Sequence, residues 1–445
     1  MPRVLVVAVV LFIGMASCST STPTPPPTPT SATVAPTTVP SSTAAADTTE
    51  PGGIDPQVVD ALRKEVEELA GIAEAIRGLP FLDEPDVVFL TESELAARVL
   101  ADFQSELEPG ELEWTGAWLD LLGLFDQSEQ TLLDIYNALL GEQVVGLYLP
   151  ETGELLVRGD TDDLSALSRT TVIHELIHAL TDQHFGIGDR LEDLIEGDRF
   201  DEATAYLSFL EGEATFFQLT YVAEYLSPAE ALALATEALA ADTSALDDTP
   251  YAIAESLFFR YEDGLNFVIA LADQGIEAFN EVHRDPPTST EQIAHYSRFA
   301  LGENPLPVAP VEVIVPGYSV VESSTWGELG LLTTFGQAIG EGAAAQIGDG
   351  WGGDVYQVLT SGDDVIFALS YVGDSEADAA EVFNAFETLA TESMDAGEAA
   401  IGDDGSLTFT GEDFAFVDRQ GSAVVFVAAS DPVAGAAAAT AVDIP

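Results

Sequence analysis

The residues best placed to do chemistry are two histidines four positions apart, with a glutamate directly after the first. His174, Glu175 and His178 form an HExxH run in a segment with helical apolar spacing. On an α-helix, residues four apart lie on one face, one turn above the other. Two imidazoles placed in this way can hold one metal ion, and Glu175 is a candidate base for the attacking water. Zn²⁺ is the usual metal for two histidines and a carboxylate, so the run predicts a zinc hydrolase and favours a peptidase.

The alternative without function is a solvent-exposed helix that carries the two histidines by chance. The apolar residues around the run argue against it, because they predict a buried stripe that His174 and His178 border. They are Val172, Ile173, Leu176, Ile177 and Leu180. Burying imidazoles without a partner is unfavourable, and a metal is one suitable partner. The other two histidines near helices, His184 and His283, are expected to be structural or solvated.

A third protein ligand is expected on a second helix, over residues 200–226. Glu211 and Glu213 lie there, and they cannot both face one metal from a regular helix because they are two residues apart. Either could equally be a solvated charge in a very acidic chain. Given the HExxH run, Glu211 is the preferred ligand and Glu213 the alternative.

Two histidines from an HExxH run plus a glutamate on a later helix resemble the gluzincin class of zinc metallopeptidases. Glu211-Gly212-Glu213-Ala214 is similar to the E-G-x-A element of aminopeptidase-type gluzincins, in which the glutamate before glycine is the ligand. The resemblance therefore implies a mainly helical peptidase fold that acts on a peptide or protein substrate.

A closer resemblance is to a group of secreted bacterial gluzincin-like proteins. They share HELxHAL-x-DQHF, here His174 to Phe185, an EGEAT element, and PPxSTEQIxH, here Pro286 to His295. The resemblance covers roughly residues 140–300. The chain departs from the thermolysin pattern at Thr215, four residues after Glu211, where that pattern has an aspartate. A group that orients a histidine ligand must therefore come from elsewhere or be absent.

His295 ends the PPxSTEQIxH stretch and has two readings. It can be a catalytic group, a proton donor or oxyanion partner brought to the metal from a distant loop. It can equally be a hydrogen-bonded histidine that holds the loop. Tyr206 and Tyr221 on the second helix are further candidates to steady an oxyanion.

The charge balance of the 445-residue chain is extreme, with 77 acidic and 13 basic residues and a formal net charge of −64. Such a surface repels nucleic acid and acidic membranes, so neither is expected as a partner through its surface. It suits surroundings rich in salt, where self-repulsion is screened. A functional alternative is a receptor for cationic substrates, but solubility and habitat are the favoured explanation.

The N-terminus has the pattern of a bacterial lipoprotein signal over residues 1–18. Arg3 precedes an apolar run, Val4 to Ile13, and small residues lead to Cys18, although Met15 stands where leucine is usual. The pattern predicts a lipid anchor on Cys18 and a location in the cell envelope; the alternative is an ordinary secretory signal. Cys18 is the sole cysteine, so no intramolecular disulfide can form. Residues 19–52, rich in Ser, Thr and Pro, are expected to be a tether.

The rest of the chain predicts an α+β fold in two parts. Residues 53–310 are expected to form the metallopeptidase-like domain, with helices at 92–106, 111–124 and 128–140, a strand at 86–90 and a hairpin at 144–158. In gluzincins a strand at the hairpin's position pairs with substrate backbone, so the resemblance implies the same here. Residues 311–445 are expected to form an α+β module, with a strand at 311–315, a helix at 326–340 and two strand–strand–helix units.

Two further functions remain open from the sequence. One is a non-catalytic zinc-binding surface lipoprotein on a peptidase-like fold. An intact Glu175 argues against it, because this residue is not needed to hold the metal. The other is an amidase that cleaves cell-wall peptide bonds, which would use the same site and differ only in substrate.

Overall fold

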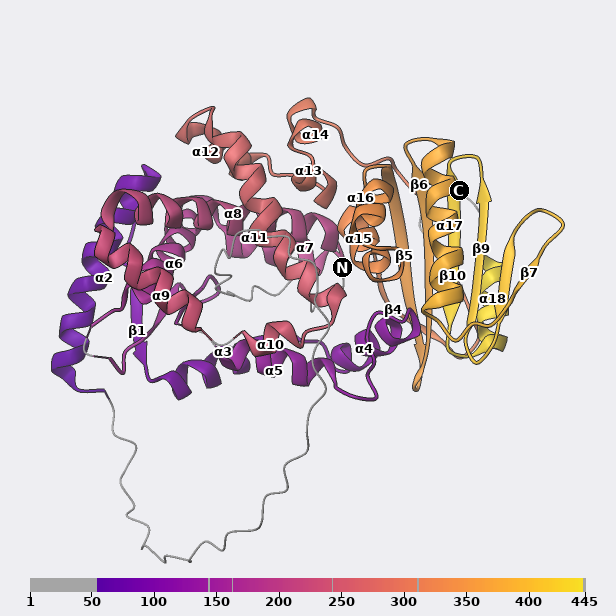
Figure 1. Ribbon diagram of the computed structural model, residues 1–445, viewed down its shortest axis with the longest axis horizontal. Coiled ribbons are helices and arrows are strands. Elements are labelled where there is room, and N and C mark those ends of the chain that lie inside the picture. Colours follow the sequence, from indigo (N-terminus) through magenta and orange to yellow (C-terminus); the bar gives the residue numbers. More distant parts are fainter. Residues whose placement is uncertain (1–53, 143–144, 162, 242, 310–311, 443–445) are drawn as a thin grey trace, which may run out of the picture.

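The chain folds into a helical part that carries a small sheet, followed by a part built on one large sheet (Figure 1). The computed structural model describes residues 54–142, 145–161, 163–241, 243–309 and 312–442. The predicted signal with Cys18 and the predicted tether lie outside these residues. The α+β class is confirmed. Among the described residues, no helix combines the length and apolar character needed to cross a bilayer.

The helical part contains thirteen helices within the described ranges. They are α2 (Pro56–Arg77), α3 (Glu92–Glu106), α4 (Glu111–Leu121), α5 (Leu132–Glu142), α6 (Ala166–Phe185), α7 (Ile187–Glu196), α8 (Phe200–Tyr225), α9 (Pro228–Ala240), α10 (Ser244–Asp247), α11 (Tyr251–Ala272), α12 (Ile276–Arg284), α13 (Thr290–Ala294) and α14 (Tyr296–Leu301). The helix predicted at 92–106 is confirmed with its bounds, because Thr91 and Glu94 form a capping box at its start. The second long helix, α8, packs against both α6 and α11.

The small sheet has the order β1-β3-β2, with β1 (Asp86–Leu90), β2 (Gly146–Leu149) and β3 (Glu154–Arg158). The predicted strand at 86–90 is confirmed, and it runs parallel to β3. The predicted hairpin is also confirmed, since β2 and β3 pair antiparallel. Its expected first residue, Val144, lies outside the described residues. Within the part of the chain that the structure describes, β2 pairs only with β3, so it is an edge strand of this sheet, and it lies against α6.

The large sheet is antiparallel, in the order β4-β5-β6-β10-β9-β8-β7. Its strands are β4 (Ser319–Ser324), β5 (Trp351–Ser361), β6 (Asp364–Gly373), β7 (Ala399–Ile401), β8 (Leu407–Thr410), β9 (Phe414–Gln420) and β10 (Ala423–Ala429), and its helices α15 (Gly327–Ile339), α16 (Glu341–Gly348), α17 (Glu376–Glu392) and α18 (Pro432–Ala441). The two predicted strand–strand–helix units are confirmed as β5-β6-α17 and β9-β10-α18. The strand predicted at 311–315 is wrong over the described residues 312–315; β4 begins later.

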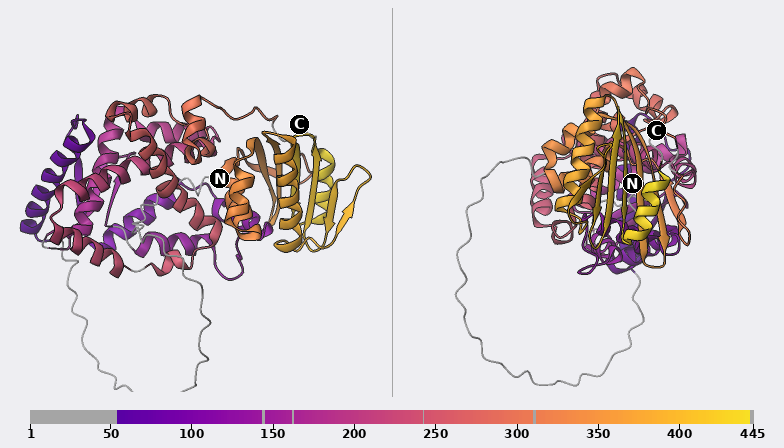
Figure 2. Two further views of the ribbon diagram at one scale, coloured as in Figure 1. Left: turned by 45° about the horizontal axis from the view of Figure 1, so that its top comes forward. Right: turned by 90° about the vertical axis from the view of Figure 1, so that its right-hand side faces the viewer.

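Helices cover both faces of the large sheet (Figure 2). Side chains alternate between the faces of a strand. On β6, Phe367 belongs to the core that contains Phe386 of α17, whereas Ile366 packs in a separate cluster with Ala434 of α18. The main core is continuous from Leu62 in α2 to the large sheet, so the helical part and the sheet part share it.

Candidate metal centre

Helix α6 presents the two histidines of the HExxH run side by side. Ser165 caps its N-terminus by accepting a hydrogen bond from Ser168 N, and Gly186 ends it in a left-handed conformation with φ 62°. Between these ends, the residues from Thr170 to Thr181 are all buried. The Nε2 atoms of His174 and His178 lie 3.1 Å apart, and the two side chains are nearly inaccessible, at 4% and 11% exposure. The predicted pairing on one helix face is therefore observed.

Glu211 comes to the same point from α8. Its Oε2 lies 3.1 Å from Nε2 of His174 and 3.7 Å from Nε2 of His178. The ligand atoms of the three residues all lie within 4.8 Å of one another. Burial would raise the pKa of Glu211, but the neighbouring His178 and His174 outweigh it and lower the pKa well below its usual range. Two imidazole nitrogens and an ionised carboxylate are a donor set that fits Zn²⁺.

Glu175 lies on the same helix with its carboxylate held at one oxygen. The backbone N–H of Tyr148 in β2 donates to Oε2 of Glu175 over 2.8 Å. The other oxygen, Oε1, is buried and has no hydrogen-bond partner among the described residues. Burial raises the pKa of Glu175 to about 7, against opposing contributions from His174 and the Tyr148 amide. A carboxylate that titrates near neutrality with one oxygen available is suited to accept and release a proton.

Glu213, the alternative ligand, faces away from this point into a second buried network. Its Oε1 lies 2.8 Å from Nε of Arg77 in α2, and its Oε2 lies 2.8 Å from Nε2 of His283 in α12. All three side chains are at most 1% exposed. The geometry thus favours Glu211 as the ligand and gives Glu213 and His283 a structural role. For His283 this agrees with the sequence expectation.

Two residues near the metal candidates were missed in the sequence. Gln218 places its Oε1 3.2 Å from Nδ1 of His174. It follows Glu211 by seven positions, two helical turns, so helical spacing could have indicated it. Tyr261 of α11 hydrogen-bonds Glu211 with its hydroxyl, and burial together with that carboxylate raises its pKa well above the usual value. No local pattern marks Tyr261, because only the packing of α11 on α8 brings it there.

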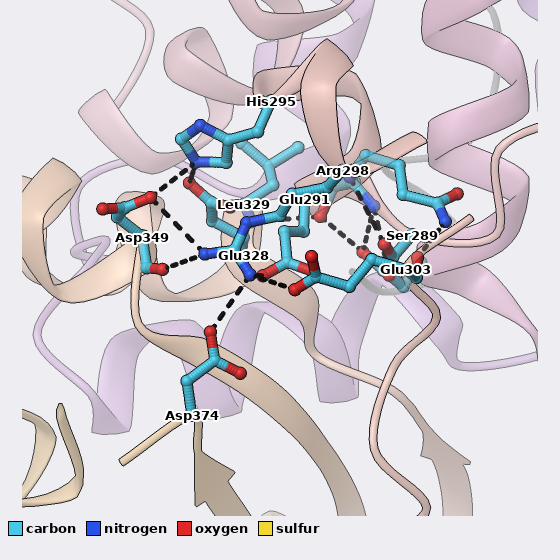
Figure 3. A network of polar contacts seen from close by, with 12 residues as sticks. Ser289, Glu291, His295, Arg298, Glu303, Glu328, Leu329, Asp349 and Asp374 are labelled. Atoms are coloured by element: carbon cyan, nitrogen blue, oxygen red, sulfur yellow. Dashed lines mark hydrogen bonds and ion pairs between the residues drawn. The ribbon is translucent and has the colours of Figure 1, made fainter. Parts of the chain in front are cut away.

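His295 lies in a different cluster, which joins α13 and α14 to the sheet part (Figure 3). Its Nε2 is 3.0 Å from Oε1 of Glu328 and 3.6 Å from Oδ1 of Asp349. No hydrogen bond or ion pair described for His295 reaches His174, His178 or Glu211. The contacts match the reading of a histidine that holds its loop.

The same cluster contains a second group of carboxylates close enough to hold a metal: Glu291, Glu303 and Asp374. Nη1 of Arg298 lies 3.0, 2.6 and 3.0 Å from them, so a guanidinium already sits among these charges (Figure 3). The guanidinium of Arg298 therefore already lies at the point where the three carboxylates converge.

The two tyrosines proposed from α8 also have other partners. The hydroxyl of Tyr206 lies 3.2 Å from Nδ1 of His283, in the network of Glu213. Tyr221 is 3% exposed, and burial raises its pKa while Arg169 opposes the shift. Neither has a described contact with the metal candidates, whereas Tyr261 does.

The DQHF residues that follow the HExxH run fasten the end of α6. Asp182 accepts a hydrogen bond from the Tyr148 hydroxyl over 2.7 Å, and Gln183 Oε1 accepts from Leu82 N over 2.8 Å. His184 Nε2 lies 2.7 Å from the Pro80 carbonyl. Phe185 stacks on His283 with ring centroids 4.3 Å apart. These residues position the helix and the edge strand, and the expected structural role of His184 agrees with its contact.

Comparison with known proteins gives a match only for the sheet part of the chain. A family model described as a domain of unknown function (DUF8575) matches residues 315–440. That stretch contains all of the large sheet and excludes the candidate metal centre. No curated protein and no solved structure matches the chain.

Proposed function

We propose that this chain is a zinc-dependent peptidase that acts outside the cytoplasm. The observation that carries the proposal is the meeting of His174, His178 and Glu211 from two helices at one buried point. Catalytic zinc sites commonly have three protein ligands of these types and keep a further position for water or substrate. Glu175 beside them supplies the acid–base group that a purely structural metal site does not need.

Each residue of the centre has a role in peptide hydrolysis. A bound Zn²⁺ would polarise the scissile carbonyl and lower the pKa of a water molecule at the site. Glu175 accepts the proton of the attacking water at its unpartnered Oε1 and delivers it to the departing amine. The Tyr148 amide, at 2.8 Å, keeps Oε2 in place during both transfers. Tyr261 orients the Glu211 carboxylate through its hydroxyl.

The test is to replace the base while the ligands stay. We expect Glu175→Gln to bind zinc as the parent chain does and to lose on the order of 10²–10⁴-fold in turnover, because an amide cannot accept the proton. Zinc content by atomic spectroscopy and cleavage of denatured casein, with and without a chelator, measure the two quantities. A fully active Glu175→Gln enzyme contradicts the assignment.

The burial of the centre favours a second candidate function, in which the protein binds a metal ion but catalyses no reaction. Glu175 and Glu211 are 0% and 2% exposed, so a peptide can reach them only if neighbouring segments move. Under this alternative the parent chain would hold zinc but cleave no member of a broad peptide library. Chelator-sensitive cleavage that Glu175→Gln abolishes would exclude it.

We also propose that the protein is held at the cell envelope through Cys18, or is secreted if that residue is not lipidated. The basis is the signal pattern of residues 1–18. We expect expression in a bacterial host to give a membrane-associated chain whose N-terminal peptide carries acyl mass. Cys18→Ser should release it, and fractionation with mass spectrometry checks both outcomes. A parent chain without acyl mass would leave the secreted alternative.

A further inference from the structure

We propose that Gln218 is a positioning residue that holds His174 in its metal-binding tautomer through a neutral hydrogen bond. The inference rests on the proposed function, because it concerns the same centre. Gln218 Oε1 lies 3.2 Å from Nδ1 of His174, on the opposite side of the ring from the 3.1 Å contact of Nε2 with Glu211. The ring is therefore held at both nitrogens by residues of one helix.

The geometry of α8 explains how one helix provides both contacts. This helix is continuous from Phe200 to Tyr225, and Glu211 and Gln218 lie seven positions apart on it. Seven residues make close to two turns, so both side chains point to the same side, toward α6. Glu211 meets the ring at Nε2 and Gln218 meets it at Nδ1.

The chemistry of a metal ligand decides what this second contact does. A neutral imidazole carries its proton on one nitrogen, and the nitrogen that binds a metal must be the one without it. With a metal held at Nε2 of His174, beside Glu211 and His178, Nδ1 is the nitrogen that carries the proton and donates it. The amide oxygen of Gln218 accepts that proton, and this stabilises the tautomer with a free lone pair on Nε2.

The neutral charge of the acceptor also matters. Carboxylates commonly fill this role beside metal-bound histidines. Here Glu211 and Glu175 already place two buried carboxyl groups at the centre, 2% and 0% exposed. A third carboxylate at position 218 would add negative charge to a poorly solvated site. Gln218 orients the ring without that charge, so metal affinity should depend on its oxygen acceptor.

Three variants of the full chain test the inference through metal binding rather than activity. Gln218→Leu removes the acceptor at similar volume, and Gln218→Glu keeps an acceptor and adds charge. Leu219→Ala, at an exposed neighbour on the same helix, is the control. Zn²⁺ affinity is measured by competition with a chromophoric chelator, and the ring tautomer by ¹⁵N NMR of the zinc-loaded protein. Melting of the metal-free variants checks that each still folds.

We expect Gln218→Leu to weaken zinc binding by about 10- to 100-fold. Gln218→Glu should bind at least as tightly as the parent, Leu219→Ala should match the parent, and the parent spectrum should show a protonated Nδ1 on His174. Equal affinity of Gln218→Leu and the parent would overturn the inference and leave the proposed function standing. So would an equal loss in Gln218→Leu and Gln218→Glu, because packing alone would then explain it. A parent chain that binds no zinc would overturn the proposed function itself.

Discussion

Glu211 and Glu213 show how two identical residues on one helix can have opposite roles. Glu211 faces α6 and meets the two histidines within 3.7 Å. Glu213 faces α2 and α12 and neutralises Arg77 at 2.8 Å. Burial would raise the pKa of Glu213, but Arg77 and His283 outweigh it and lower it below its usual range. Glu211 therefore lies in the candidate metal centre, whereas Glu213 balances a buried charge within the fold.

We predict that the same substitution at these two positions produces different losses. Glu211→Gln should lose zinc affinity by an order of magnitude or more, because a neutral amide replaces the carboxylate ligand. Glu213→Gln should keep zinc affinity but destabilise the fold by about 3–5 kcal/mol, because it leaves Arg77 buried without its counter-charge. Denaturant unfolding and chelator competition on both variants measure the two effects. A reversed pattern would mean that Glu213 is the ligand.

At the scale of elements, the crossing of α8 and α11 is made by two glycines. A Cβ on Gly212 would come within 2.2 Å of the Gly264 carbonyl, and a Cβ on Gly264 within 2.0 Å of Ser208 O. Backbone of the two helices is therefore in direct contact. This close approach lets Tyr261 of α11 reach Glu211, so the crossing affects the candidate metal centre as well as the packing.

We predict that Gly264→Ala pushes α11 away from α8. The overpacked crossing should lose about 1–3 kcal/mol or more of unfolding free energy, and zinc binding should weaken as Tyr261 withdraws. Gly71→Ala in α2 is a matched control, because nothing lies within 4 Å of its added Cβ. That variant should be neutral or gain about 0.5–1 kcal/mol, since alanine favours a helix over glycine. Equal melting temperatures for the two variants would contradict the close crossing.

At the scale of the whole molecule, buried polar contacts join the helical part to the sheet part. Asp201, in the first turn of α8, accepts a hydrogen bond from the Thr290 hydroxyl over 2.6 Å. The same hydroxyl accepts from Leu329 N of α15 over 3.2 Å. On the hydrophobic side, Trp118 of α4 packs edge-on against Trp326 at 5.2 Å between ring centroids. The helix that carries Glu211 thus begins at a joint with the sheet part.

The joint predicts a dependence of stability on pH. Burial raises the pKa of Asp201 to about 7, although the Thr290 hydroxyl opposes the shift. An acid whose pKa is raised on folding stabilises the fold fully below its unfolded pKa, about 4, and loses that contribution as pH rises through the folded value. Stability should therefore fall between about pH 4 and pH 7, by at most about 1.4 kcal/mol per pH unit from this residue.

Asp201→Asn isolates this contribution, because its amide keeps an oxygen acceptor for Thr290 but does not ionise. We expect urea unfolding from pH 4.5 to 7.5 to show a shallower decline for this variant than for the parent chain. Glu387→Gln, at an exposed position of α17, should keep the parent slope. The same slope in Asp201→Asn and the parent would show that Asp201 is ionised in the folded state across this range.

The sequence could predict what depends on neighbours along the chain. Helical periodicity places His174 and His178 on one face, and they do meet, at 3.1 Å. Capping and turn residues mark α3 and the β2–β3 hairpin. The strand expected at 311–315 failed because valines that alternate with other residues are compatible with any half-buried extended segment, paired or not. An extended segment becomes a strand of this sheet only where its backbone pairs with a neighbour. The residues that pair with β5 are those of β4, Ser319–Ser324.

Tertiary structure alone decided which residues join the two histidines. Each residue turns a helix by about 100°, so Glu211 and Glu213 had to point apart, but no local rule states which direction faces α6. The packing of α8 between α6 and α11 settles that direction and adds Gln218 and Tyr261. It also gives His295 its partners in the sheet part. Spacing along one helix is a local property, whereas the side of a helix that meets another depends on contacts between residues far apart in the chain.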